Sequence, residues 1–154
     1  MDVRIFAVLA AIAVAVGSVV PAAAQSESAV VENAWSRASI GTRRPGVAYM
    51  QIRNVGASPI TLTGVEADLA EMAEIHRTST NDQGVSMMAP AGEVEIAPGA
   101  TVALEPGGLH VMLRKLKRPM NQGDSFSLRI SLSDGGEVSV EVPILGIAAQ
   151  GPQD

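Results

Sequence analysis

Residues 125–143 read SFSLRISLSDGGEVSVEVP, and this stretch decides the fold class. Apolar and polar side chains alternate on both sides of Asp134-Gly135-Gly136. Such alternation is typical of half-buried β-strands, and a short glycine-rich link between two such runs is typical of a hairpin. The residues expected to face the core are Phe126, Leu128, Ile130, Leu132, Val138, Val140 and Val142. We assign these positions to packing and give them no chemistry.

Short alternating runs separated by clusters of Gly, Pro, Asn and Asp continue through the rest of the chain. This pattern predicts an all-β sandwich or barrel in a single domain. One short helix is expected around Asp68–Met72. The expected strands are Val30–Arg37, Val47–Arg53, Ile60–Val65, Ala73–Arg77, Val85–Ala89, Val94–Ile96, Thr101–Leu104, Leu109–Leu116, Ser125–Leu132 and Glu137–Pro143.

The N-terminal segment has the features of a secretory signal peptide. Ile5–Val20 is almost entirely apolar, Arg4 precedes it, and Ala22-Ala23-Ala24 offers a small-residue cleavage site. A membrane anchor is the alternative, but the run is shorter than the roughly 20 apolar residues that a spanning helix needs. We expect cleavage after Ala24 and a mature protein in the periplasm.

The two ends of the mature chain are small or polar, which indicates flexible segments. The expected organisation is a signal peptide at 1–24, a flexible segment at 25–29, a β-sandwich domain at 30–145 and a flexible tail at 146–154.

Composition excludes several classes of function. The chain has 154 residues, a net charge of −5 and no basic stripe, which argues against a nucleic-acid partner. It has no cysteine, so thiol redox chemistry, blue-copper electron transfer and thiolate zinc sites are excluded. With two histidines and no cysteine, we find no nucleophile–base arrangement that would predict an enzyme.

One of the two histidines lies in the triplet His110-Val111-Met112. On a strand, residues i and i+2 point to the same face, so His110 and Met112 would lie together opposite the apolar Leu109, Val111 and Leu113. Imidazole and thioether without thiolate form a ligand set that suits cuprous copper better than harder metals. The turn before His110 would place this pair at a strand end that can open to solvent.

The other histidine, His76, precedes an expected hairpin. A three- or five-residue loop centred on Asp82 would put Met88 directly opposite His76, with Cβ atoms roughly 5 Å apart. A two-residue loop would instead put Ala89 opposite His76 and Met87 on its diagonal. Met87 is therefore a competitor for the role of fourth ligand.

The spacing of His76, Met88 and His110-Val111-Met112 resembles the H(M)-x10-M-x21-H-x-M motif of the periplasmic copper chaperone family PCu(A)C. Residues 31–37, 48–54 and 107–113, and Leu116–Pro119 followed by Gly123-Asp124, are also similar to that family. The resemblance covers Val30 to Pro143.

The resemblance implies a cupredoxin-like Greek-key β-sandwich that binds one Cu(I) ion through His76, Met88, His110 and Met112. It also implies delivery of copper for cytochrome c oxidase assembly, with the copper subunit of the oxidase or a Sco-type thiol protein as acceptor. We expect a monomer without stable membrane insertion.

Two departures from the family pattern matter. Arg77 stands where the motif often has methionine, and the tail lacks the His- and Met-rich extension linked to a cupric site, so we predict a single Cu(I) site.

The alternatives to a copper chaperone are a periplasmic copper buffer for tolerance, or a β-sandwich that binds a peptide or glycan. The latter would need clustered aromatic residues, which are few in this chain.

Overall fold

The structure is a computed structural model that describes residues 24–153, and within that range the regular structure consists of strands. The expected signal peptide therefore lies outside the described residues, apart from Ala24. The strands are β1 (Ala24–Gln25), β2 (Ala29–Arg37), β3 (Gly46–Asn54), β4 (Ile60–Ala67), β5 (Ala70–Thr80), β6 (Ser86–Pro90), β7 (Val94–Ile96), β8 (Thr101–Leu104), β9 (Leu109–Leu116), β10 (Ser125–Leu132) and β11 (Glu137–Leu145). Over the same residues, there is no helix long and apolar enough to cross a membrane.

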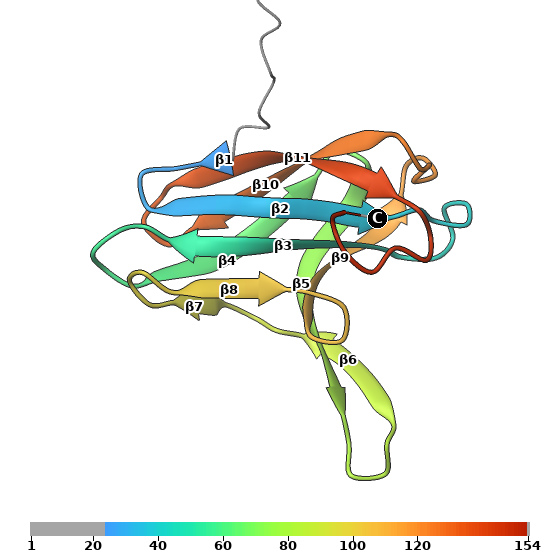
Figure 1. Ribbon diagram of the computed structural model, residues 1–154, viewed down its shortest axis with the longest axis horizontal. Helices are drawn as coiled ribbons and strands as arrows, with labels where there is room; N and C mark the ends of the chain where they lie inside the picture. The colour runs from blue at the N-terminus through green and yellow to red at the C-terminus, as the bar shows by residue number, and fades with distance from the viewer. Residues whose placement is uncertain (1–23, 154) are drawn as a thin grey trace, which may run out of the picture.

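The strands form one mixed sheet with the order β6-β5-β9-β8-β3-β2-β11-β10-β4-β7, and β1 pairs with β2. Most neighbours are antiparallel, but β11 runs parallel to β2 and β8 runs parallel to β9. The sheet curls over, so that β4 and β7 lie behind β3 and β8 in Figure 1. The two layers enclose one large apolar core. The expected all-β sandwich is confirmed.

The hairpin of β10 and β11 has the expected alternation. Phe126 pairs with Val142, Leu128 with Val140 and Ile130 with Val138. All are buried except Val140, which is half-buried and packs against the core. Because every second side chain is buried, this hairpin contributes a continuous apolar surface to the core of the domain.

Every expected strand is present, several with the expected bounds, but the expected helix at Asp68–Met72 is wrong. Asp68 and Leu69 form a tight turn, and the chain enters β5 at Ala70. Leu69 and Ala70 are buried in the core, and the backbone of Asp68 donates to the carbonyl of Ser127 at 3.1 Å. These tertiary contacts outweigh the weak local preference for helix.

The segment after β11, expected to be a flexible tail, lies against an aromatic cluster on the outer face of β2 and β3. Ala149 is buried against Trp35 and Tyr49, whose ring centroids are 4.6 Å apart. The Arg37 guanidinium lies over both rings and donates to the Ala149 carbonyl at 2.7 Å. Arg37 is thus part of this packing.

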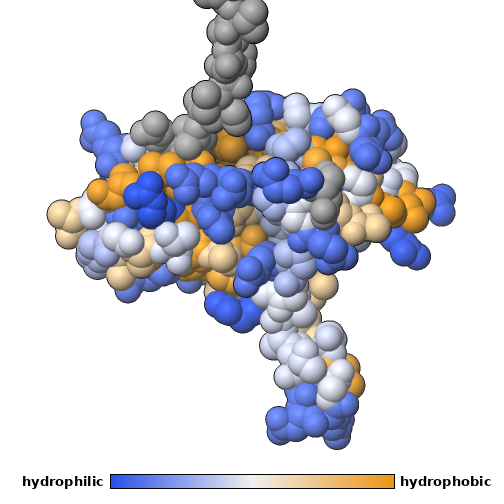
Figure 2. All heavy atoms as spheres, viewed as in Figure 1, coloured by the Kyte–Doolittle hydropathy of each residue, from blue (hydrophilic) through white to orange (hydrophobic). Residues whose placement is uncertain are grey.

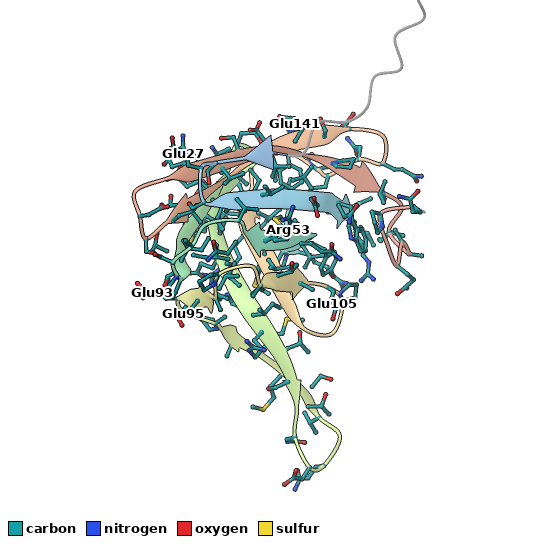
Figure 3. The ribbon with its side chains drawn as sticks, turned by 60° about the vertical axis from the view of Figure 1, so that its left-hand side comes forward. Glu27, Arg53, Glu93, Glu95, Glu105 and Glu141 are labelled. Atoms are coloured by element: carbon teal, nitrogen blue, oxygen red, sulfur yellow. The ribbon has the colours of Figure 1, made fainter. Side chains whose placement is uncertain are left out.

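The outer part of β5 and all of β6 extend away from the body as a hairpin arm, which we define as residues 77–90. The arm projects in both views of the ribbon (Figures 1 and 3). Its surface in Figure 2 is pale to blue, with orange confined to one side. The labelled carboxylates Glu93, Glu95 and Glu105 lie on the body near the base of this arm in Figure 3.

Candidate metal centre

The two histidines of the chain lie side by side on neighbouring strands. His76 on β5 is the direct cross-strand partner of His110 on β9. Their ring centroids are 6.1 Å apart, and the rings are tilted by 42°. Both residues are buried, with 7% and 3% of their surface exposed. The register of one antiparallel ladder therefore brings together residues that are far apart in the sequence.

Each imidazole uses one nitrogen in a hydrogen bond and leaves the other without a partner. Nε2 of His76 lies 3.2 Å from a carboxylate oxygen of Glu74, and Nδ1 of His110 lies 3.2 Å from the carbonyl oxygen of Gly108. Nδ1 of His76 and Nε2 of His110 are buried and make no hydrogen bond to any described residue. Buried polar atoms without partners are rare because they lose hydration without compensation. A metal ion bound by both nitrogens would remove this cost.

Met112 lies on the same face as the two histidines. It follows His110 by two residues on β9, and its cross-strand partners are Glu74 on β5 and Val47 on β3. The opposite face of β9 carries the fully buried Val111 and Leu113. The strand thus buries its aliphatic side and presents imidazole and thioether together, as the alternation predicted. Met112 is half-buried at this position.

The predicted direct pairing of His76 with Met88 is wrong. Pro90 is the partner of His76, and Met88 is the partner of Thr78. Met88 remains on the His76 face, but it is a diagonal neighbour, and diagonal neighbours typically lie about 7–8 Å apart, with a slightly shorter distance between their Cβ atoms. Met88 therefore pairs with a residue two positions farther along β5 than predicted.

The loop of the arm explains the shifted register. The loop spans residues 81–85 and is centred one residue later than predicted. The Asn81 side-chain oxygen accepts hydrogen bonds from the backbone of Gln83 and Val85, and Gly84 has a positive φ of 78°. Asn81 therefore starts the turn and ends β5 at Thr80. The sequence pattern alone predicts a turn centred on Asp82.

The same register separates Met87 from Met88. Met87 is the partner of Ser79, so it lies on the face of the arm that points away from His76. Both methionines are strongly exposed, at 56% and 58%. Of these two thioethers, Met88 is the one on the side of the histidines.

A network of charges surrounds the His76 ring. The Glu74 carboxylate accepts a hydrogen bond from the Arg114 guanidinium at 2.7 Å and also contacts His76. The hydrogen bond from His76, with the positive charge of Arg114, lowers the pKa of Glu74 from its usual value. Glu74 is therefore ionised at neutral pH.

Burial lowers the pKa of His110 from its usual value of 6.5, and the neighbouring His76 acts in the same direction. The hydrogen bond to Gly108 opposes this shift. Since the protonated form is disfavoured, His110 presents a neutral ring, which is the form that binds metals.

Sequence reasoning missed Glu74 and Arg114. A signal was present, because Glu74-Ile75-His76 has the same alternating spacing as His110-Val111-Met112 and continues the ligand face by one position. Arg114 extends the same face of β9. The missing piece was the pairing of β5 with β9, which the sequence did not reveal.

The donor set at this centre is soft. Among residues 24–153, no group of three or more His, Cys, Asp and Glu side chains is placed to hold an ion. Any metal bound by the two histidines would therefore have to complete its coordination with thioethers or outside ligands. Such a mixture favours Cu(I).

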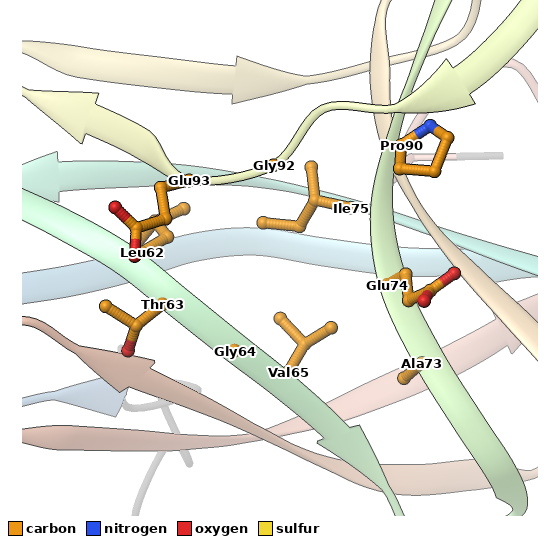
Figure 4. A pocket seen from close by; sticks show the side chains of 10 residues that line it. All are labelled: Leu62, Thr63, Gly64, Val65, Ala73, Glu74, Ile75, Pro90, Gly92 and Glu93. Atoms are coloured by element: carbon orange, nitrogen blue, oxygen red, sulfur yellow. The ribbon is translucent and has the colours of Figure 1, made fainter.

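A groove near this face does not include the histidine pair. It has a volume of about 350 Å³ and lies between β4 and β5, with Glu74 and Pro90 among the residues that line it (Figure 4). The histidines do not line it. The candidate centre is thus defined by the two buried nitrogen atoms of the histidine rings that have no hydrogen-bond partner.

Comparison with known proteins identifies relatives over most of the chain. The family described as "Putative lipoprotein LpqE-like" matches residues 29–144. "Putative lipoprotein Lxx21020" from Leifsonia xyli subsp. xyli (strain CTCB07) is 30% identical over 120 residues, which cover 78% of this chain and 71% of that protein.

Solved structures match the fold. The structure described as "apo PmoF2 PCuAC domain" gives a TM-score of 0.68 at 20% identity and covers 84% of this chain and 99% of that chain. The "Solution structure of CuI-DR1885 from Deinococcus Radiodurans" gives a TM-score of 0.60 at 29% identity, over 78% of this chain and 79% of that one. The expected cupredoxin-like fold and the resemblance to PCuAC domains are confirmed.

Proposed function

Since this chain belongs to the LpqE-like family, which is related to the PCuAC domains, we propose that it is an exported copper chaperone. It binds one Cu(I) ion through His76, His110, Met112 and Met88 and passes that ion to another protein. In this proposal the copper is cargo, and the protein performs binding and transfer without catalysis. The mature protein works in the periplasm.

The observation that carries this proposal is the pair of buried nitrogens without partners. The two rings stand 6.1 Å apart, a separation that one ion can span with metal–nitrogen bonds of about 2 Å. Met112 lies on the same face, and Met88 lies on the adjoining arm. The relatives with solved structures include a PCuAC domain described as copper-bound and a protein described as CuI-DR1885.

The chemistry of these donors suits transfer. Two neutral imidazoles and two neutral thioethers leave the single charge of Cu(I) intact, and they bind less strongly than thiolates would. Because the histidines are buried while Met88 is exposed, an incoming acceptor would first displace the thioether of Met88. The histidine nitrogens would be released last.

Copper titration tests the site. Under reducing conditions, competition with a chromogenic Cu(I) chelator should show one tight equivalent for the wild-type protein. A Met88→Ala, Met112→Ala double variant should bind much more weakly, because only the two imidazoles remain. Full-strength binding by the double variant would contradict the assigned ligands.

The acceptor that we propose is the copper subunit of cytochrome c oxidase, reached directly or through a Sco-type thiol protein. This part rests on the family resemblance. Deleting the gene should lower oxidase activity in copper-limited cells, and added copper should restore it. Normal oxidase activity combined with increased copper sensitivity would instead identify a copper buffer.

A further inference from the structure

We propose that Glu74, held in place by Arg114, is a positioning residue that orients the His76 ring so that Nδ1 is the nitrogen available to copper. The consequence for copper rests on the proposed function, whereas the orientation itself is a property of the metal-free protein. Glu74 is not a ligand in this proposal and acts only through His76.

The contacts of Glu74 define this role. Glu74 precedes His76 by two residues on β5, so both side chains lie on one face of the strand. The Glu74 carboxylate accepts from Arg114 at 2.7 Å and contacts Nε2 of His76 at 3.2 Å. Arg114 lies on β9, so this link ties together the same two strands that carry the histidines.

The hydrogen-bond partners dictate which nitrogen of each ring carries the proton. The Glu74 oxygen that lies 3.2 Å from Nε2 of His76 is the same oxygen that accepts from Arg114, so it acts as an acceptor, Nε2 is the N–H group and Nδ1 keeps its lone pair. A carbonyl oxygen also can only accept, so the ring of His110 carries its proton on Nδ1 and keeps the lone pair on Nε2. The two nitrogens with free lone pairs are the same two that are buried without partners.

The two rings are held by different means. The partner of His110 is a backbone carbonyl, which no substitution at Gly108 can remove. The partner of His76 is a side chain, and it can be removed. Without Glu74, the His76 ring could rotate about its χ2 bond and turn a carbon toward the ion instead of Nδ1. Outer partners of metal-binding histidines commonly fix the tautomer and the ring in this way.

Glu74 can be replaced without hollowing the core. Its side chain is 42% exposed and lines the groove between β4 and β5. Neighbouring Ile75 supplies the core contact of this strand. A Glu74→Ala variant should therefore fold, which circular dichroism and thermal unfolding can verify.

The test combines nitrogen NMR of the metal-free protein with copper affinity. Long-range 1H–15N spectra of the wild type should show His76 protonated at Nε2 and His110 at Nδ1. Glu74→Ala should lose the slowly exchanging Nε2–H signal of His76 and leave His110 unchanged. Its Cu(I) affinity should fall about 10- to 100-fold, the loss typical of outer partners of metal-binding histidines.

Two further variants make the result specific. Glu74→Gln keeps an acceptor oxygen for Nε2–H and should restore much of the affinity. Glu71→Ala removes the comparable ion pair between Glu71 and Lys115, whose charged atoms are 3.3 Å apart. This pair bridges the same two strands but does not involve the histidines. The Glu71→Ala variant should change neither the NMR signals of His76 nor the affinity.

The outcomes separate this inference from the proposed function. Protonation of His76 at Nδ1 in the wild type, or unchanged copper affinity in Glu74→Ala, would overturn the positioning role. A wild-type protein that binds no Cu(I) would overturn the proposed function, even if the NMR spectra showed the expected tautomers.

Discussion

The buried histidine pair and the exposed hairpin arm hold the four predicted copper donors under contrasting conditions. His76 and His110 lie within the ladder of β5 and β9, each fixed by a hydrogen bond and almost fully shielded from water. Met88 lies on the arm with 58% of its surface exposed and no direct pairing to either histidine. Met112 is intermediate, since it shares the rigid strand of His110 but is only half-buried.

This contrast suggests a division of labour. Donors fixed before the metal arrives bind strongly, because little freedom is lost on binding. An exposed donor at the edge contributes less affinity but is the one that a partner protein can reach and replace. The histidine pair would then determine how tightly copper is held, and the arm would determine how it enters and leaves.

Removing a histidine should have the largest effect. In His110→Asn, the side-chain amide can still donate to the Gly108 carbonyl, but the metal-facing nitrogen is gone. We expect Cu(I) affinity to fall by more than the roughly 100-fold that loss of an outer partner can cost. Chelator competition measures the loss, and circular dichroism checks the fold. Retention of tight binding would refute a role for His110.

Removing Met112 should weaken binding more than removing Met88. Met112→Ala takes away a thioether on the same strand as His110, while Met88→Ala takes away one that the arm must bring toward the site. We expect losses of roughly 100-fold and roughly 10-fold, the latter equal to about 1.4 kcal/mol. The same competition assay compares them.

Met87→Ala is the matched control for the arm. Met87 is as exposed as Met88 and is adjacent to it, but it lies on the other face. Copper affinity should be unchanged in this variant. A loss in Met87→Ala as large as that in Met88→Ala would mean that the arm adopts the alternative register when copper binds.

Mild oxidation should distinguish the two regions without mutation. Exposed Met87 and Met88 should form sulfoxides before half-buried Met112, because peroxide reaches them first. Cu(I) affinity should then fall by about as much as in Met88→Ala. Mass spectrometry identifies the oxidised residue. If a Met88→Leu variant lost the same affinity on oxidation, the effect could not come from Met88.

The pH dependence of stability should show the smallest effect. Because burial lowers the pKa of His110 in the folded state, the unfolded chain binds more protons just below its usual pKa of 6.5. Part of the free energy of unfolding of the metal-free protein depends on neutral His110. This part should be fully present above pH 6.5. It should decline as the pH falls toward the lowered folded-state pKa.

Urea unfolding between pH 7.5 and 5.5 measures this decline. One proton allows a slope of at most about 1.4 kcal/mol per pH unit. His110→Gln, which does not titrate, should show a smaller slope over this range. Carboxylates with lowered pKa, such as Glu74, contribute only at more acidic pH. An identical slope in the variant would remove His110 as the cause.

Local patterns were enough to predict the fold but not all of the site. The alternation in β9 placed His110 and Met112 on one face, since a period of two residues needs no information about neighbours. The helix expected at Asp68–Met72 failed because burial of Leu69 in the core is a tertiary effect. The register of the arm failed because it depends on which residue begins the turn, and Asn81 begins it.

The pairing of His76 with His110 lay beyond local patterns. It joins strands that are separated by β6, β7 and β8 in the chain, and the family motif gave their spacing in sequence without their contact in space. Glu74 and Arg114 were missed for the same reason. Their meaning depends on that ladder, because only the ladder brings Arg114 to Glu74 and Glu74 to the ring of His76.

X-ray absorption of the Cu(I)-loaded protein is the most direct test of the proposed copper ligands. We predict one copper ion with both nitrogen and sulfur neighbours, and a smaller sulfur contribution in Met88→Ala with the nitrogen contribution unchanged. A spectrum with nitrogen and oxygen neighbours alone, or one whose sulfur contribution is the same in the Met88→Ala, Met112→Ala double variant, would contradict this prediction.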